Sequence, residues 1–313
     1  MKKLFILFGI LFTLLISLTS CDLGENYDVV VTNFVGYDAV RAVSKHTDIN
    51  CKMLLKPGND IHSYEPSGAE IRAVMNAKVF VYVGGESDSE WVESDILGNV
   101  KDKDIIIINM FEILEDRLIL EDGEEDEYDE HVWTNPSNYG LVVEAVRDAL
   151  IKISKNDKDI ILDNADTYLD ELNELDRNMG LVIKNGDKDK IVVADRNPFM
   201  YFDKYYGLEI IGALEGCSSD KNIPSSKLGE LINVVEGSKL KAIFIIELSD
   251  GKIAADVKNQ VRKDIIDGKY SGDNVEVLTL YSMQNISLEC FNSGLTYNEM
   301  FKRNIESIRY ALS

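Results

Sequence analysis

A long amphipathic stretch between two sets of alternating apolar and helical segments constrains the fold of this chain most strongly. Within residues 157–183, apolar side chains recur at the spacing of one helix face: Leu162, Ala165, Leu169, Leu172, Leu175 and Met179. Four strand–helix units precede this stretch, and a second set of alternating units follows it from Lys190. Short apolar runs that alternate with helices are typical of parallel sheets covered by helices on both faces. The sequence therefore predicts an α/β protein with two parallel-sheet lobes, joined by one long rigid helix, and a ligand cleft between the lobes.

The same pattern divides the chain into five parts. We predict a signal peptide at residues 1–20, a lipid-anchored linker at 21–27 and an N-terminal α/β lobe at 28–156, which contains an acidic loop at 121–130. A connecting helix at 157–185 then leads to a C-terminal α/β lobe at 186–313. With 313 residues, of which 45% are hydrophobic, the chain is long enough for two ordinary domains.

The start of the chain has the layout of a secretory signal. Lys2 and Lys3 precede an apolar run from Leu4 to Leu18, and small residues lead to Cys21. The sequence LTSC is similar to the bacterial lipoprotein signal, which implies cleavage before Cys21 and a diacylglycerol on its thiol. A plain signal peptide and an uncleaved anchor helix are the alternatives. The prediction is an extracytoplasmic protein that is anchored to the cell membrane by lipid, because no other run approaches the roughly 20 apolar residues of a membrane span.

The charge of the chain restricts its partners. Lys and Arg together number 33, against 55 Asp and Glu, which gives a formal net charge of -22. Such a surface repels nucleic acid and anionic lipid headgroups, and it concentrates cations near the protein. We therefore expect no nucleic-acid partner.

Two of the three histidines lie in polar loops beyond strand-like runs. His62 lies in GNDIHSYEPS after the run at 51–55, and His131 lies in DEHVW, beyond the run at 105–109. In an open α/β sheet such loops gather at the carboxyl ends of the strands, where ligands bind. Imidazole is a ligand of Zn, Cu, Fe and Ni, so the pair suggests a transition-metal site. The alternative is two unrelated surface histidines, because two ligands fall short of the usual four.

The acidic loop and a loop cysteine are further candidates for contact with cations. Eight of the eleven residues at 121–131 are acidic, and like charges at that density favour a mobile, solvated loop that cannot be buried. The loop is either merely solvated or a weak collecting surface for divalent cations. Cys217, in EGCSSD, is either an ordinary loop thiol or a soft metal ligand.

Several longer motifs resemble one family, the substrate-binding lipoproteins of bacterial ABC transporters for zinc and manganese, of the cluster A-I type. GNDIHSYEPS and DEHVWTNPSN resemble its first and second histidine motifs. NADTYLDELNELD resembles the end of its connecting helix, NPFMYFDKYYGLE the segment after its third histidine, and LTYNEMFKRNIESI its C-terminal helix. The resemblance covers nearly the whole mature chain. It implies two α/β lobes joined by a rigid helix, with a metal held in the cleft by three histidines and one carboxylate.

The resemblance assigns two metal ligands and places unusual residues at the other two positions. His62 and His131 match the first two histidines. Arg196 stands where the family has its third histidine, and Met283 stands where it usually has an aspartate. Arginine cannot ligate a cation because its guanidinium stays protonated, and a methionine thioether favours Cu+ over Zn2+ or Mn2+. Other groups would have to complete the coordination shell.

Two carboxylates are the leading candidates to complete the shell. Glu247 ends the strand-like run KAIFIIEL, so it should point into the cleft, and Asp195 adjoins Arg196. Either carboxylate could bind Zn2+ through oxygen. Each has a rival role, because Asp195 could pair with Arg196 or Arg41, and Glu247 could pair with Arg196. Cys217 is a further candidate.

Together these features predict a receptor that is not an enzyme. We expect a monomeric, extracytoplasmic lipoprotein that binds a divalent transition metal between its lobes, Zn2+ before Mn2+ or Cu+, and delivers it to an ABC permease and its ATPase. One alternative is a protein of the same fold that binds a metal chelate or an anion through Arg196. Another is a surface adhesin-type lipoprotein that has lost transport. An enzyme has the least support, because the sequence contains no GxxxxGKS, GxxxxGKT, HExxH or GxSxG motif.

Overall fold

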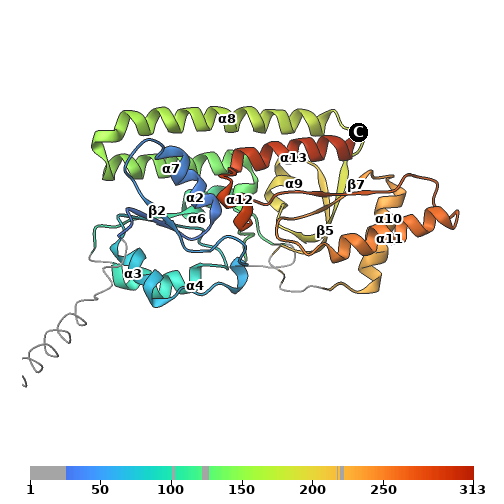
Figure 1. Ribbon diagram of the computed structural model, residues 1–313, viewed down its shortest axis with the longest axis horizontal. Helices are drawn as coiled ribbons and strands as arrows, with labels where there is room; N and C mark the ends of the chain where they lie inside the picture. Colours follow the sequence, from blue (N-terminus) through green and yellow to red (C-terminus); the bar gives the residue numbers. More distant parts are fainter. Residues whose placement is uncertain (1–25, 101–102, 122–126, 217, 219–221) are drawn as a thin grey trace, which may run out of the picture.

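The protein consists of two α/β lobes that lie side by side along its long axis. The computed structural model describes residues 26–313 except 101–102, 122–126, 217 and 219–221. The predicted signal peptide and Cys21 therefore lie outside the described residues. The helix α8 (Lys158–Lys184) runs along one edge of the molecule and passes both lobes (Figure 1). The predicted architecture of two parallel-sheet lobes and a long helix is confirmed.

The N-terminal sheet contains four parallel strands in the order β2-β1-β3-β4. They are β1 (Val29–Val31), β2 (Cys51–Met53), β3 (Val79–Tyr82) and β4 (Ile106–Asn109). The central strands β1 and β3 are buried along their whole length, whereas the edge strands are mostly half-buried. Valine runs occur in the centre because helices cover both faces of a parallel sheet.

The helices of this lobe begin where the sequence contains capping residues. Asn33 caps α2 (Phe34–Val43), and Ser67 forms a capping box with Glu70 at the start of α3 (Gly68–Asn76). The helical segment between β3 and β4 consists of α4 (Ser89–Trp91), the π-helical turn η2 (Val92–Leu97) and α5 (Gly98–Val100). The turns α6 (Met110–Ile113), η3 (Glu115–Arg117) and η4 (Val132–Thr134) lead to the long helices.

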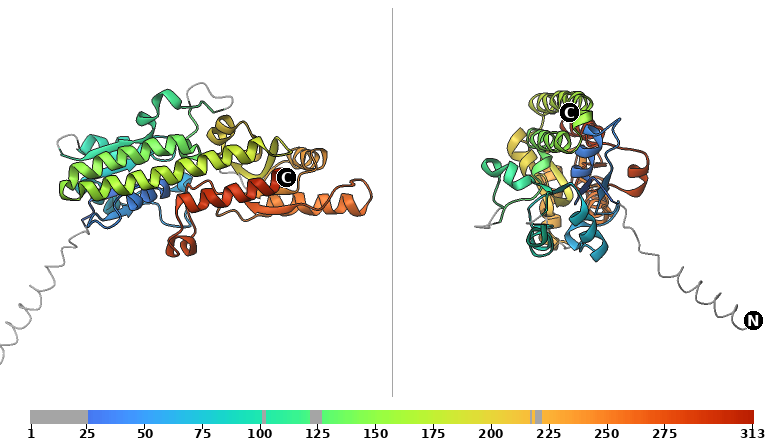
Figure 2. Two further views of the ribbon diagram at one scale, coloured as in Figure 1. Left: turned by 90° about the horizontal axis from the view of Figure 1, so that it is seen from above. Right: turned by 90° about the vertical axis from the view of Figure 1, so that its left-hand side faces the viewer.

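A pair of helices, α7 and α8, leads from the N-terminal lobe to the C-terminal lobe, and α8 makes the connection. Pro136 occupies the first turn of α7 (Pro136–Ile153), as predicted, and the short turn η5 (Lys155–Asp157) leads to α8. One face of α8 is buried, and its residues are Ile161, Ala165, Tyr168, Leu172 and Met179. α7 packs against α8, and Figure 2 shows the two helices side by side in the N-terminal half of the molecule. The buried face of α8 therefore packs against α7, α2 and α13.

The C-terminal sheet repeats the topology of the first, with the order β6-β5-β7-β8 and parallel pairing throughout. Its strands are β5 (Lys190–Asn197), β6 (Glu209–Glu215), β7 (Ala242–Ile245) and β8 (Glu276–Thr279). The register of β5 against β6 shifts between Val193 and Arg196. The helices are α9 (Met200–Tyr206), α10 (Ser225–Gly237), α11 (Lys252–Ile266), α12 (Leu288–Asn292) and α13 (Tyr297–Leu312).

A buried polar network fixes three helices at the junction of the lobes. The Asp38 carboxylate of α2 accepts hydrogen bonds from the Tyr168 hydroxyl of α8 at 2.6 Å and from the Tyr297 backbone N–H of α13 at 3.1 Å. Arg41 pairs with the same carboxylate and donates to the Leu295 carbonyl at 2.9 Å. Because a buried charge needs such partners, the network ties the connecting and C-terminal helices to the N-terminal lobe. Among the described residues, no helix is both long and apolar enough to cross a membrane.

Candidate metal site between the lobes

The loop that carries His62 lies against the C-terminal part of the chain. The Gly58 N–H donates to the Ile286 carbonyl at 2.8 Å, and the Asn285 side-chain amide donates to the Lys56 and Asn59 carbonyls at 3.2 and 2.5 Å. The backbone of His62 forms the 3₁₀ turn η1 (Ile61–Ser63), whereas its side chain lies outside the described part of the structure. The loop after β2 therefore reaches the interlobe junction, as the sequence predicted.

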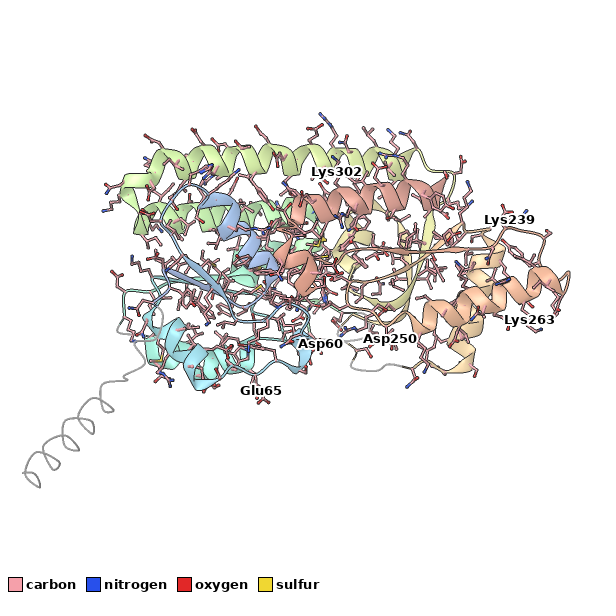
Figure 3. All side chains as sticks on the ribbon, in the orientation of Figure 1. Asp60, Glu65, Lys239, Asp250, Lys263 and Lys302 are labelled. Atoms are coloured by element: carbon pink, nitrogen blue, oxygen red, sulfur yellow. The ribbon has the colours of Figure 1, made fainter. Side chains whose placement is uncertain are left out.

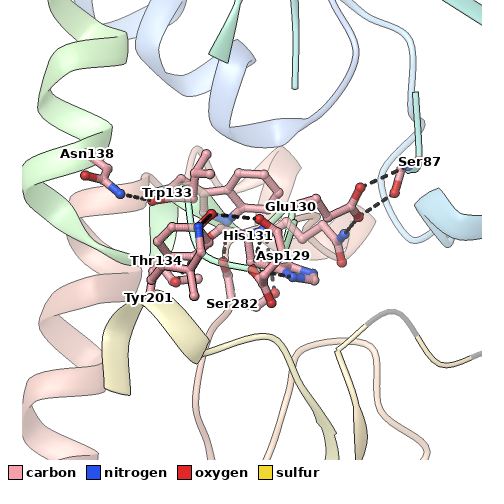
Figure 4. Close-up of polar contacts among 12 residues, drawn as sticks. Ser87, Asp129, Glu130, His131, Trp133, Thr134, Asn138, Tyr201 and Ser282 are labelled. Atoms are coloured by element: carbon pink, nitrogen blue, oxygen red, sulfur yellow. Dashed lines mark hydrogen bonds and ion pairs between the residues drawn. The ribbon is translucent and has the colours of Figure 1, made fainter. Parts of the chain in front are cut away.

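His131 lies in the same junction and is 0% exposed. The backbone N–H of His131 donates to Asp129 Oδ1 at 2.8 Å, and the imidazole Nδ1 of His131 lies 3.4 Å from the same oxygen (Figure 4). The imidazole contacts the edge of the Trp133 ring, with centroids 5.6 Å apart. Trp133 in turn donates from Nε1 to the Ser282 carbonyl at 2.8 Å, which joins this turn to the loop after β8. Asp129 and Trp133 thus fix the position of the imidazole, and Ser282 of the other lobe holds Trp133.

The carboxylates around His131 determine its protonation. Burial alone would lower the pKa of His131, but the charges of Asp129, Glu130 and Glu121 raise it, and the net direction of the pKa is upward. The hydrogen bond from the imidazole to Asp129 acts in the same direction. Negative charge around a buried imidazole is also the environment that attracts a metal cation.

The C-terminal lobe approaches His131 through a glycine at the end of β6. A Cβ atom at Gly216 would lie 3.3 Å from His131 Cε1 and 3.2 Å from the Asn197 carbonyl oxygen. A side chain at this position would therefore crowd the imidazole. Cys217, the next residue, lies outside the described part of the structure. The backbone of the C-terminal lobe consequently forms one wall of the His131 site.

Glu247 lies just beyond β7 and is engaged by the loop after β8. Its Oε2 accepts from the Ser282 N–H at 2.7 Å, and its Oε1 accepts from the Ser282 hydroxyl at 2.6 Å. Burial raises the pKa of Glu247. The hydrogen bonds from Ser282 lower this pKa, but the net direction is upward. The side chain lines a cavity of about 120 Å³ together with Asp60, Ile61 and Arg196. This placement brings Glu247 to the same cavity as the turn that carries His62.

Asp195 lies on the wall of a second cavity, of about 180 Å³. Its Oδ1 accepts from the Arg196 backbone N–H at 2.8 Å, and its Oδ2 accepts from the Ser249 hydroxyl. Asp60 and Asp250 line the same cavity from the two lobes, and Figure 3 shows them on neighbouring parts of the molecule. Both predicted carboxylates thus face interlobe cavities, but these are different cavities.

Arg196 pairs with neither of the carboxylates that the sequence suggested. Its Nη1 lies 3.2 Å from Asp60 Oδ2, in the N-terminal lobe. The predicted pairing with Glu247 or with the Asp195 carboxylate is wrong for the described residues, and Arg41 pairs with Asp38 instead of Asp195. Arg196 lies at the register shift near the end of β5, and its guanidinium reaches the Asp60 carboxylate of the other lobe.

Met283 lies in the hydrophobic core, although the resemblance placed it at a cleft position. It is 1% exposed, and its sulfur lies 3.9 Å from the Asn304 amide nitrogen of α13. Its backbone has a φ of 61°, in the left-handed region that few side chains adopt. Met283 belongs to the core cluster and does not line the cavities of Glu247 and Asp195.

The end of the acidic loop is buried, which corrects the expectation of a wholly solvated loop. Residues 122–126 lie outside the described residues, but Asp129 and Glu130 are 2% and 1% exposed. Glu130 accepts from the Ser87 N–H at 3.0 Å and from the Gln284 amide at 3.2 Å, so it links both lobes. Hydrogen bonds from these donors offset the free-energy cost of burying the carboxylate charge. Sequence analysis missed Glu130, although its position directly before His131 was a usable signal.

The described side chains do not by themselves assemble a metal shell. No group of three or more His, Cys, Asp or Glu among them is placed to hold a metal ion. The side chain of His62 and residue Cys217 lie outside the described part of the structure. The structure therefore brings His131, Glu247 and Asp195 to the interlobe junction without joining them in one shell.

Comparison with known proteins gives a consistent family match. The model of the family described as "Zinc-uptake complex component A periplasmic" matches residues 29–311. The zinc-binding protein AdcA of Streptococcus pyogenes is 25% identical over 300 residues, covering 90% of this chain and 55% of the relative. The manganese-binding lipoprotein MntA of Halalkalibacterium halodurans is 28% identical over 258 residues, covering 82% and 79%. This chain spans little more than half the length of the streptococcal relative.

Solved structures share the fold. The Zn(II)-bound ZnuA-like domain of Streptococcus pneumoniae AdcA superposes with a TM-score of 0.71 at 24% identity, covering 92% of this chain and 99% of the domain. The periplasmic zinc-binding protein TroA of Treponema pallidum gives a TM-score of 0.73 at 24% identity, covering 92% and 100%. At this identity the likeness concerns the arrangement of the two lobes.

Proposed function

The chain belongs to the ZnuA family of zinc-uptake components, and we propose that it is a receptor that binds a divalent transition metal between its lobes for an ABC transporter. The observation that carries this proposal is the setting of His131. A buried imidazole lies at the junction of two lobes, with a carboxylate beside one ring nitrogen. Such a carboxylate fixes the orientation of a metal-binding imidazole and raises its basicity.

The proposed coordination shell draws on both lobes. His62 and His131 are its imidazoles, and Glu247 is the preferred oxygen ligand because it shares a cavity with Ile61, the neighbour of His62. Asp195 is the alternative. Zn2+ is the proposed cargo and Mn2+ the alternative, since relatives of both kinds match the chain. Met283 is not included in this proposed shell, because it packs in the hydrophobic core with its sulfur 3.9 Å from the Asn304 amide nitrogen.

The proposed physiological setting follows from the family. We infer delivery of the metal to an ABC permease and its ATPase, attachment to the membrane through lipid on Cys21, and a monomeric, non-catalytic protein outside the cytoplasm. An anion-binding role through Arg196 loses support, because Arg196 pairs with Asp60 and lines a cavity with two further aspartates.

Calorimetric titration of the mature domain with Zn2+, Mn2+ and Cu+ tests the proposal. We expect Zn2+ to bind more tightly than about 10 μM. His131→Asn should weaken Zn2+ binding by more than the roughly 10- to 100-fold that loss of an indirect contact costs. His46→Asn is the matched control, because His46 is exposed and its φ of 66° suits asparagine. Failure of all three metals to bind at 10 μM or better, or equal effects of the two variants, would overturn the proposal.

A further inference from the structure

One ion pair crosses from lobe to lobe beside the loop that carries His62. The Arg196 guanidinium, at the end of β5, lies 3.2 Å from the Asp60 carboxylate, two residues before His62. The side chains of Arg196 and Asp60 are 22% and 47% exposed, so water reaches the pair from one side. We call this contact the Asp60–Arg196 clasp. Unlike the capping contacts within each lobe, it joins a loop of the N-terminal sheet to a strand of the C-terminal sheet.

The clasp also divides the space between the lobes. Asp60 and Arg196 both line the cavity of about 180 Å³ that contains Asp195 and the cavity of about 120 Å³ that contains Glu247. The ion pair is therefore the shared wall of the two cavities. Asp195 lines only the larger of these two cavities, and Glu247 lines only the smaller one.

We propose that Arg196 is a positioning residue for the metal site: through Asp60 it holds the His62 turn against the C-terminal lobe before a metal arrives. This inference rests on the proposed function. Arg196 contributes no ligand, and its guanidinium stays charged at all working pH values. It acts as a fixed cation of the protein that brings the lobes together without a metal ion. A turn that is already held in place loses less conformational freedom when it binds its ligand.

The surroundings of the clasp set its expected strength. Asp195 and Asp250 line the same cavity and add negative charge around the guanidinium. The Asn285 amide and the Gly58 N–H hold the same loop independently, so the clasp is one of several contacts. A partly exposed ion pair contributes little, and salt screens it. Its loss should therefore change metal affinity by only about three- to fivefold at low salt.

Hydrogen exchange of the metal-free protein tests the clasp directly. The Gly58 N–H, which donates to the Ile286 carbonyl, reports whether the His62 loop stays against the other lobe. We expect Arg196→Gln and Asp60→Asn to accelerate exchange at residues 57–64, and the double variant to equal either single variant. Lys190→Gln is the control, because it removes an ion pair with Glu209 inside the C-terminal lobe. Unchanged exchange in Arg196→Gln, or additive effects in the double variant, would overturn the inference.

Zinc titration of the same variants separates this inference from the proposed function. If the wild-type protein binds Zn2+ and Arg196→Gln binds it about three- to fivefold more weakly at low salt but equally at about 1 M salt, the clasp positions the metal site. If Arg196→Gln matches Lys190→Gln at low salt, the positioning role is refuted while the proposed function stands. If the wild-type protein binds no metal, the proposed function fails and the positioning role fails with it, although the exchange data can still show the interlobe contact itself.

Discussion

The two lobes share one sheet topology but differ in what they present at the junction. Both sheets are parallel, and the second strand order β6-β5-β7-β8 repeats the first, β2-β1-β3-β4. The N-terminal lobe supplies both candidate imidazoles, His62 and His131. The C-terminal lobe supplies carboxylates and Arg196, which already have partners. The comparison teaches that topology determines where the loops meet, whereas individual side chains determine whether a ligand can be held there.

A buried carboxylate, Asp88, and a half-buried one, Glu247, show this difference between the lobes. Asp88, beyond β3, accepts hydrogen bonds from the N–H groups of Val83 and Gly84 at 2.8 and 2.9 Å. Both donors belong to the N-terminal lobe. Glu247, beyond the corresponding strand β7, binds Ser282, whose carbonyl accepts from Trp133 of the other lobe. Burial raises the pKa of both carboxyl groups. Only Glu247 is connected to the interlobe site, and the following experiments address this difference.

The largest expected effect concerns the carboxylate beside His131. Asp129→Asn keeps an oxygen for the His131 N–H but removes the charge beside Nδ1, so Zn2+ affinity should fall by roughly 10- to 100-fold. Competition with a chromogenic chelator measures the affinity. Asp116→Asn, at an exposed position of η3, is the control with the same loss of charge. If the two variants bind Zn2+ with equal affinity, the Asp129 carboxylate does not support metal binding by His131.

An intermediate effect should distinguish the two carboxylates of the C-terminal lobe. Glu247→Gln retains atoms that can contact Ser282, and it should weaken Zn2+ binding by about tenfold, or about 1.4 kcal/mol. Asp195→Asn should change it by less than about twofold, because Asp195 lies beyond the Asp60–Arg196 clasp. Both values come from the same chelator competition. The reverse order of effects would place the metal in the cavity of Asp195.

The last effect concerns Asp88 and appears in the stability of the fold instead of in metal affinity. Burial raises the pKa of Asp88 to about 7, with a smaller contribution from Glu130, against about 3.9 in an unfolded chain. Between the two pKa values, the Asp88 carboxyl is protonated in the native state and ionised in the unfolded chain. The free energy of unfolding should therefore decrease as the pH rises through this range, by up to about 1 kcal/mol per pH unit. Urea unfolding at about pH 5 and 7 should show a flatter dependence in Asp88→Asn. If the unfolding free energies of the wild-type protein and of Asp88→Asn change equally with pH, the proton on Asp88 does not stabilise the N-terminal lobe.

Much of the fold could be predicted from local sequence patterns. The valine run of β1, the Ser67 capping box and Pro136 in the first turn of α7 each fix an element through nearby residues. The candidate site was less predictable. His131 was found because histidines are few, whereas Glu130 was hidden within an acidic run that suggested only solvation. The partner of Arg196 could not be found from spacing, because Asp60 lies 136 positions away.

The sequence by itself determined the alternation of strands and helices, the long connecting helix and the loops that carry the histidines, because these depend on periodicity and capping over a few residues. Only the tertiary structure decided that Met283 enters the core, that Asp129 and Glu130 are buried, and that Arg196 reaches Asp60 across the junction. These outcomes depend on which residues distant in sequence come into contact and on whether each buried charge has a partner. The local sequence pattern does not contain this information.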